Sequence, residues 1–174
     1  VQFQNGVLAR YPGAALELAV FALALGVYGL FNAALNFVPQ LVTQFARTRA
    51  AWRVTLRFVL AIAAVFAVLV EAIAISPAGA GLLGLAFGIE GELLARVLAY
   101  LCLLAPVLVL EGLRLAFVGL LVQRRRTGRV TLLNTIYLAT VAGVLVAGLA
   151  AGVEPTRTLV LGQASAALVH CVLG

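Results

Sequence analysis

The chain has 174 residues, of which 64% are hydrophobic and 10% are charged, and its mean hydropathy is +1.16. About a quarter of the residues of a soluble globular domain are charged, so this composition excludes that class and indicates an integral membrane protein. The net charge of +6 does not indicate nucleic-acid binding, because the arginines fall in short turns between apolar segments, where they report membrane orientation. The chain contains no methionine, so Val1 is not an initiator residue, and we expect the chain to be processed, truncated or part of a longer one.

The apolar segments predict an all-α, polytopic helix bundle in a single transmembrane domain, with about five spanning helices after the tail of a first helix. Residues 1–10 form that tail, and a turn follows at residues 11–13. The later elements are expected as helices over 14–47 and 52–75, a Gly-rich outer segment over 76–91, a long helix over 92–123, and helices over 130–151 and 156–174. Proline removes a backbone hydrogen bond, so we expect kinks at residues 36–38, before Pro39, and at Pro106.

A stripe of polar residues runs along the helix expected over 14–47. Its members recur every three or four residues: Tyr28, Asn32, Asn36, Gln40 and Thr43. Lipid offers these groups no hydrogen-bond partners, so the stripe faces other helices or water. Two interpretations remain open, namely hydrogen bonding between helices and the wall of a polar cavity.

The helix expected over 92–123 carries an ionisable pair, Glu111 and Arg114, near its middle. The two residues are three positions apart, so they can pair on one face of the helix. An ionisable residue inside a membrane is a candidate functional group, although a paired Glu and Arg can also serve only to lock helix packing. Small residues at Ala105, Gly112 and Gly119 predict a second face that lets another backbone approach closely.

The last two spans carry few polar groups. The helix over 130–151 is polar only where it begins, with Asn134 and Tyr137, and His170 is the one histidine of the chain. A lone buried histidine is more often a packing residue than a proton carrier, and Cys102 and Cys171 are expected to be buried thiols. The sequence contains no metal-ligand cluster, Ser-His-acid set or phosphate-binding glycine loop, so we expect no enzyme, cofactor or metal.

The arginines predict the orientation of the chain in the membrane. Eight of them lie in the two turns expected on one side, over residues 47–57 and 124–129, whereas the other side holds only Arg10, Arg96 and Arg157. Short loops rich in arginine stay on the cytoplasmic side. We therefore expect a multi-pass protein of the cytoplasmic (inner) membrane, with both arginine-rich turns in the cytoplasm.

Two stretches carry a resemblance to a known family: NGVLARYPGAALELAVFALALGVYGL at residues 5–30 and LAPVLVLEGLRLAFVGLLVQRRRTGRVTLLNTIYLATVAG at residues 104–143. They resemble the N-terminal six-helix lobe of the multidrug and toxin extrusion (MATE) superfamily of exporters and flippases. Hydropathy and turn placement match along nearly the whole chain. Within the superfamily the chain looks closest to the progressive-ankylosis type of transporter, whose second helix has a similar YGL and an F-x-x-P pattern like that of residues 37–40.

The resemblance implies half of a 12-helix MATE-like fold, in which two lobes rock about a cavity and export a substrate by alternating access. By position, it implies these inward-facing candidates: Asn5, Asn32, Asn36, Gln40, Glu111, Arg114 and Asn134. A single lobe cannot form the two-lobed cavity. Many ion-coupled members place an acidic residue in the first helix, whereas the polar residues there are Gln2, Gln4 and Asn5, so the coupling chemistry does not carry over.

The expected function is therefore that of the N-terminal lobe of a secondary active exporter, which moves an organic ion or amphiphile across the cytoplasmic membrane. The expected partners are the lipid bilayer, a small-molecule substrate, and a second lobe or other membrane subunits, without nucleic acid. The alternative is a non-transporting structural or accessory subunit, packed through its small-residue faces against a larger membrane protein complex.

Overall fold

The computed structural model describes residues 2–10 and 13–174, so Val1 and the predicted turn residues Tyr11 and Pro12 lie outside the described residues. Every regular element in those two ranges is a helix, which confirms the all-α class. In chain order the elements are α1 (Gln2–Leu8), α2 (Ala14–Ala34), the 3₁₀ turn η1 (Leu35–Phe37), α3 (Val38–Phe45), α4 (Arg49–Ile75), α5 (Pro77–Phe87), α6 (Gly91–Leu104), α7 (Val107–Gln123), α8 (Thr127–Ala150) and α9 (Pro155–Leu173).

Several of these helices are long and apolar enough to cross a membrane. Within the described ranges there are four such segments, Ala14–Phe45, Arg49–Ile75, Thr127–Ala150 and Pro155–Leu173, and α6 with α7 makes a fifth if the bent pair counts as one span. Large apolar side chains stand exposed along them, with Leu30 73%, Val68 66% and Leu138 67% accessible. Lipid, unlike water, solvates such a surface favourably. The chain is a multi-pass membrane protein.

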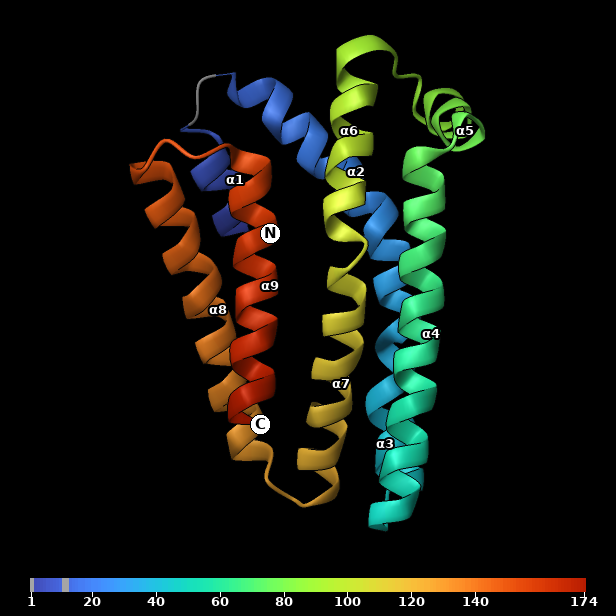
Figure 1. Ribbon diagram of the computed structural model, residues 1–174. Helices are drawn as coiled ribbons and strands as arrows, with labels where there is room; N and C mark the ends of the chain where they lie inside the picture. The colour runs from blue at the N-terminus through green and yellow to red at the C-terminus, as the bar shows by residue number, and fades with distance from the viewer. Residues whose placement is uncertain (1, 11–12) are drawn as a thin grey trace.

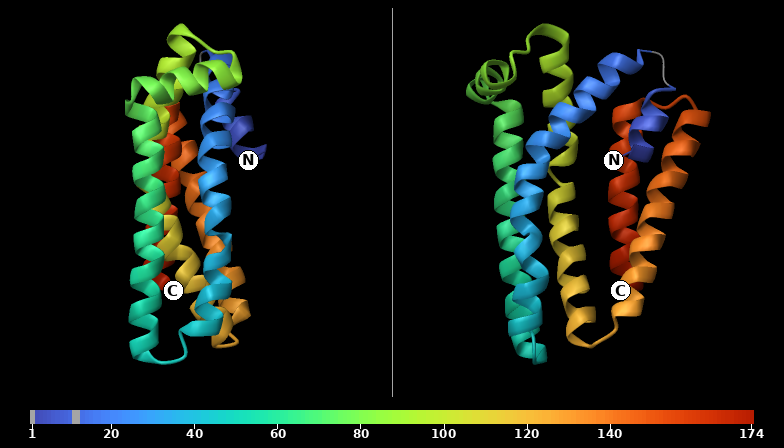
Figure 2. Two further views of the ribbon diagram at one scale, coloured as in Figure 1. Left: turned by 90° about the vertical axis from the view of Figure 1, so that its right-hand side faces the viewer. Right: turned by 180° about the vertical axis from the view of Figure 1, so that it is seen from behind.

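The helices lie side by side in one bundle, and α7 occupies its middle (Figure 1). α7 packs against α3 and α4 on one side and against α9 on the other. Seen from behind, it lies between the α2–α3 segment and a hairpin of α8 and α9 (Figure 2). The short helix α5 runs across one end of the bundle, within the segment expected to be the Gly-rich outer loop (Figure 2).

Local sequence signals explain where several helices begin and bend. Thr48 caps α4, because its hydroxyl accepts a hydrogen bond from the backbone N–H of Ala51 at 3.1 Å, and Ser76 caps α5 in the same way. The break between α2 and α3 is the turn η1, directly before Pro39. α6 and α7 meet around Pro106 and are bent by 43° relative to each other. Both breaks lie where prolines predict kinks.

Glycines let α7 approach its neighbours closely. A Cβ atom added at Gly119 would lie 2.8 Å from the carbonyl oxygen of Pro39 and 2.8 Å from the Cβ of Val42, and one at Gly112 would lie 2.8 Å from the Cβ of Ala63. These distances are shorter than real Cβ contacts, so only glycine fits at either position. The predicted small-residue face of this helix is confirmed, with α3 and α4 as its partners.

The two ends of the bundle differ in charge. The turns between α3 and α4 and between α7 and α8 lie at the same end, which we call the arginine-rich end (Figure 1). No glutamate of the described chain lies in these turns or in the helix ends beside them. At the opposite end, Arg96 of α6 binds Glu17 of α2 at 2.7 Å and Glu92 at 2.8 Å. The contact with Glu17 joins α2 to α6, whereas the contact with Glu92 lies within α6.

Candidate functional site

The ionisable pair of α7 lies inside the bundle. Arg114 donates from its Nε to the Oε2 of Glu111 at 2.7 Å, so the predicted pairing of the two residues is confirmed. Glu111 is only 5% exposed, whereas Arg114 is partly buried. α7 ends at Gln123, so at ~1.5 Å per residue Glu111 lies about 18 Å from that end, near the middle of a hydrocarbon layer about 30 Å thick.

A tyrosine from α8 completes the surroundings of the carboxylate. The hydroxyl of Tyr137 donates a hydrogen bond to the Oε1 of Glu111 at 3.1 Å, so each carboxylate oxygen has its own donor. The guanidinium carbon of Arg114 lies 5.1 Å from the centre of the Tyr137 ring, within the range of a cation–π interaction. Tyr137 therefore holds both members of the ion pair and ties α8 to α7.

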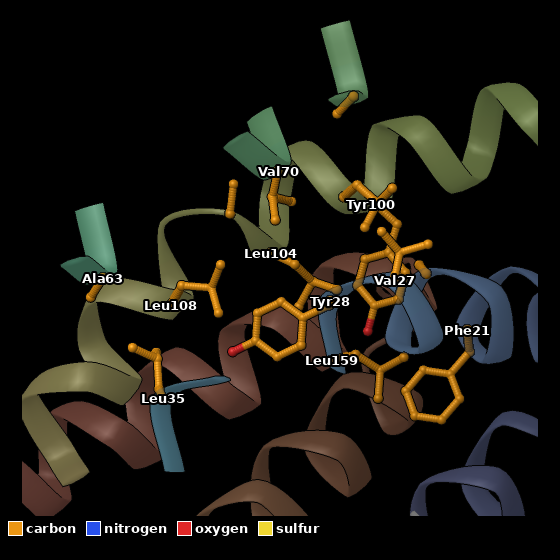
Figure 3. Packing of buried hydrophobic residues seen from close by; sticks show 14 of the residues in the cluster. Phe21, Val27, Tyr28, Leu35, Ala63, Val70, Tyr100, Leu104, Leu108 and Leu159 are labelled. Atoms are coloured by element: carbon orange, nitrogen blue, oxygen red, sulfur yellow. The ribbon is translucent and has the colours of Figure 1, made fainter. Parts of the chain in front are cut away.

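Two further polar side chains are buried on helices that pack against α7. His170, in the last turn of α9, is completely buried, and Tyr28 of α2 is 5% exposed. Figure 3 shows Tyr28 in the apolar cluster beside Leu104 of α6. We call Tyr28, Glu111, Arg114, Tyr137 and His170 the central cluster. Four helices, α2, α7, α8 and α9, contribute to it.

The central cluster and its neighbourhood contain buried polar atoms without partners. Neither ring nitrogen of His170 has a hydrogen-bond partner among the described residues. The Oδ1 atom of Asn32, one turn after Tyr28, also has no partner there. Buried polar groups in proteins are almost always paired, with protein or with water. The unpaired atoms are therefore candidate contacts for water, an ion or a ligand. No group of three or more His, Cys, Asp or Glu in the described part of the chain could hold a metal ion.

The polar stripe predicted along the second helix is divided in the structure. Tyr28 is buried and Asn32 partly buried, whereas Asn36 and Gln40 are exposed. The hydroxyl of Thr43 donates to the Pro39 carbonyl at 2.7 Å. The turn η1 accounts for the division of the stripe, because a 3₁₀ turn has about 3.0 residues per turn instead of 3.6. It rotates its own residues, which include Asn36, and those after it relative to Tyr28 and Asn32. The stripe is therefore not one continuous wall.

The remaining predicted residues fall into two groups. The buried or partly buried group comprises Glu111 and Arg114 on α7 and Asn32 on α2. The exposed group comprises Asn5 on α1, Asn134 on α8, Asn36 and Gln40. Sequence reasoning did not include Tyr137 in the site and treated His170 as a packing residue. Tyr137 lies in the polar part of its helix, three positions after the exposed Asn134, but this spacing gives no signal that it bonds Glu111.

Removing the hydroxyl of Tyr137 is expected to destabilise the bundle slightly. The variant Tyr137→Phe keeps the ring over Arg114 but loses the hydrogen bond to Glu111, and such bonds in membrane proteins contribute about 1 kcal/mol. Unfolding in detergent micelles measures the difference. Thr135→Val is the matched control, since the exposed Thr135 hydroxyl bonds only the carbonyl of Thr131 on its own helix. Equal losses in both variants would argue against the bond between α7 and α8.

Fold and site together define a multi-pass helical membrane protein with a buried ionic cluster near mid-membrane. Comparison of the chain with known protein families, curated proteins and solved structures finds no match. The resemblance to the MATE superfamily therefore stays a prediction, and the function is argued from the cluster.

Proposed function

We propose that the chain is one lobe of a secondary active exporter that moves an organic ion or amphiphile across the cytoplasmic membrane by alternating access. In this proposal the lobe is the N-terminal one of a MATE-like transporter, and the arginine-rich end faces the cytoplasm. The observation that carries the proposal is the central cluster, a charged pair near mid-membrane that Tyr137 of α8 also contacts, together with unpaired buried polar atoms on α2 and α9.

The composition of the cluster supports transport over simple packing. An ion pair that only locks two helices needs no further polar groups, and unpaired polar atoms beside it lower stability. Here His170 and Asn32 add unpaired atoms on two more helices. The carboxylate of Glu111 is held from both α7 and α8, so a movement of one helix against the other changes its partners. A substrate or coupling ion that binds Glu111 therefore makes different contacts before and after α7 and α8 move, and so favours one of the two conformations.

The test is efflux from cells that express the intact gene product, loaded with ethidium as an organic-cation probe or with carboxyfluorescein as an organic-anion probe. Glu111→Gln is expected to slow efflux of the exported probe at least about tenfold, equivalent to about 1.4 kcal/mol of barrier. Asn36→Leu tests the exposed part of the stripe in the same assay. Glu92→Gln is the control, because Glu92 is exposed and lies away from the central cluster, at the end of the bundle opposite the arginine-rich end. Unchanged efflux in Glu111→Gln and Asn36→Leu would remove the cavity assignment.

The alternative function is a non-transporting structural or accessory subunit of a larger membrane complex. The observation that favours this role is the exposure of Asn36 and Gln40 within an apolar span. Polar side chains in such a position need a protein neighbour, because lipid offers them no hydrogen-bond partner. The two functions differ in what the intact gene product contains. A product about twice this length with a second block of apolar spans supports the exporter, whereas copurification with other subunits in a fixed ratio supports the accessory role.

A further inference from the structure

A polar pocket of about 280 Å³ opens at the arginine-rich end, apart from the central cluster. Its walls come from the turn between α3 and α4 and from the end of α7. The polar and aromatic residues that line it are Arg47, Thr48, Arg49, Trp52, Gln123 and Arg124. Three arginines from two separate turns therefore converge on one cavity, which we call the arginine pocket.

The walls of the arginine pocket are held by contacts between α3, α4 and α7. Gln123 donates from its Nε2 to the carbonyl of Thr43 at 3.1 Å, which joins the end of α7 to the end of α3. The ring of Trp52 lies against Phe117, with 5.9 Å between ring centres, which joins α4 to α7. The close approach of α7 to α3 at Gly119 lies directly below. The helices that carry the pocket are therefore held in place without a ligand, and a ligand has to order only the exposed side chains of Arg47, Arg49 and Arg124.

The charge of the arginine pocket is not neutralised by the protein. The ion pairs found among the described residues engage Arg96, Arg114 and Arg157, and none involves an arginine of the pocket. Membrane orientation explains why arginines lie at this end, but it does not require them to share a cavity. Arg53, Arg57, Arg125 and Arg129 serve orientation equally and lie outside the pocket.

We propose that the arginine pocket binds a phosphate group, presented by the headgroup of an anionic membrane lipid. Guanidinium groups bind phosphate through paired, charge-assisted hydrogen bonds. The indole N–H of Trp52 and the side-chain amide of Gln123 add further donors to the lining of the pocket. A tryptophan at the end of a spanning helix places the pocket at the level of lipid headgroups. Basic pockets between membrane helices are suited to such headgroups. Free phosphate has the same chemistry, and the test separates the two sources.

The test uses the intact gene product, purified in a neutral detergent and titrated with short-chain phosphatidylglycerol, phosphatidylcholine or inorganic phosphate. The pocket variant carries Arg47→Gln, Arg49→Gln and Arg124→Gln. The control variant carries Arg53→Gln, Arg57→Gln and Arg125→Gln, so both lose three positive charges at the same end. Phosphatidylglycerol is expected to bind saturably, and at least about tenfold more weakly to the pocket variant, because each arginine near an anionic headgroup contributes on the order of 1 kcal/mol. The control variant is expected to change affinity less than about twofold.

The outcomes separate a defined site from diffuse charge. Equal weakening in the two variants, or equal binding of phosphatidylcholine and phosphatidylglycerol, would overturn the proposal. Inorganic phosphate that binds as tightly as phosphatidylglycerol and is lost in the pocket variant would keep the site and identify free phosphate as its ligand. Thermal unfolding in the same detergent shows whether the variants fold. The single variants Arg124→Gln and Arg125→Gln repeat the comparison, with a smaller expected loss confined to Arg124→Gln, if a triple variant does not fold.

Discussion

Replacing Glu111 with leucine is expected to lower the free energy of unfolding by about 3–5 kcal/mol, because the change leaves a charged neighbour inside the bundle without its partner. Arg114 loses its 2.7 Å contact to the carboxylate, and the Tyr137 hydroxyl loses its acceptor. The double variant Glu111→Leu with Arg114→Leu is expected to recover most of this loss, since an apolar pair of similar size replaces the ion pair. Unfolding of the purified protein in detergent or bicelles measures both.

An exposed ion pair provides the control for this comparison. Glu92→Leu removes a contact to Arg96 at the bundle end, where Arg96 keeps its second partner, Glu17. The expected change is below about 1 kcal/mol, the usual range for surface pairs. If the double variant at Glu111 and Arg114 were as unstable as the single one, the burial of an unpaired charge would not be the cause of the loss.

The second large effect is expected at Gly119. Gly119→Ala places a Cβ 2.8 Å from the carbonyl oxygen of Pro39 and 2.9 Å from its Cα, so the backbones of α3 and α7 must move apart. We expect a loss of about 3 kcal/mol, the upper part of the range for overpacked cores, because backbone atoms cannot rotate away as a side chain can. The same unfolding measurement applies.

Gly143→Ala is the matched control, since a Cβ at this position of α8 meets no atom within 4 Å. Alanine favours helix over glycine by about 1 kcal/mol, so this variant is expected to be as stable as the parent protein or more stable. A loss at Gly143→Ala as large as at Gly119→Ala would show that glycine is needed for chain flexibility rather than for close packing.

Features set by neighbours in the sequence were predictable. Pro39 and Pro106 interrupt helices through their own ring geometry, whichever fold surrounds them. The pairing of Glu111 with Arg114 follows from their spacing on one helix. Helix existence and the membrane class follow from the length of the apolar runs, because few other structures satisfy the backbone in lipid.

Features set by the packing of distant helices were not predictable. Tyr137 reaches the ion pair, and His170 is buried, only because α8 and α9 fold back against α7, and no spacing along the chain encodes that arrangement. The division of the polar stripe depends on a single 3₁₀ turn, which shifts Asn36 onto an exposed face. The arginine pocket likewise needs two turns that are far apart in sequence but adjacent at one end of the bundle.

The α8–α9 hairpin is a closely packed part of the bundle. Its two helices contact each other more extensively than any other helix pair in the described structure, and Gly148 of α8 lies directly against Thr158 of α9. Among the side-chain hydrogen bonds of the described residues, the one from Tyr137 is the single bond that joins this hairpin to α7. Two helices packed in this way are expected to open as one cooperative unit, so we expect the amide hydrogens in the middle of α8 and α9 to show one free energy of opening in hydrogen exchange. The carboxylate of Glu111 would then lie at the boundary between this unit and the rest of the bundle.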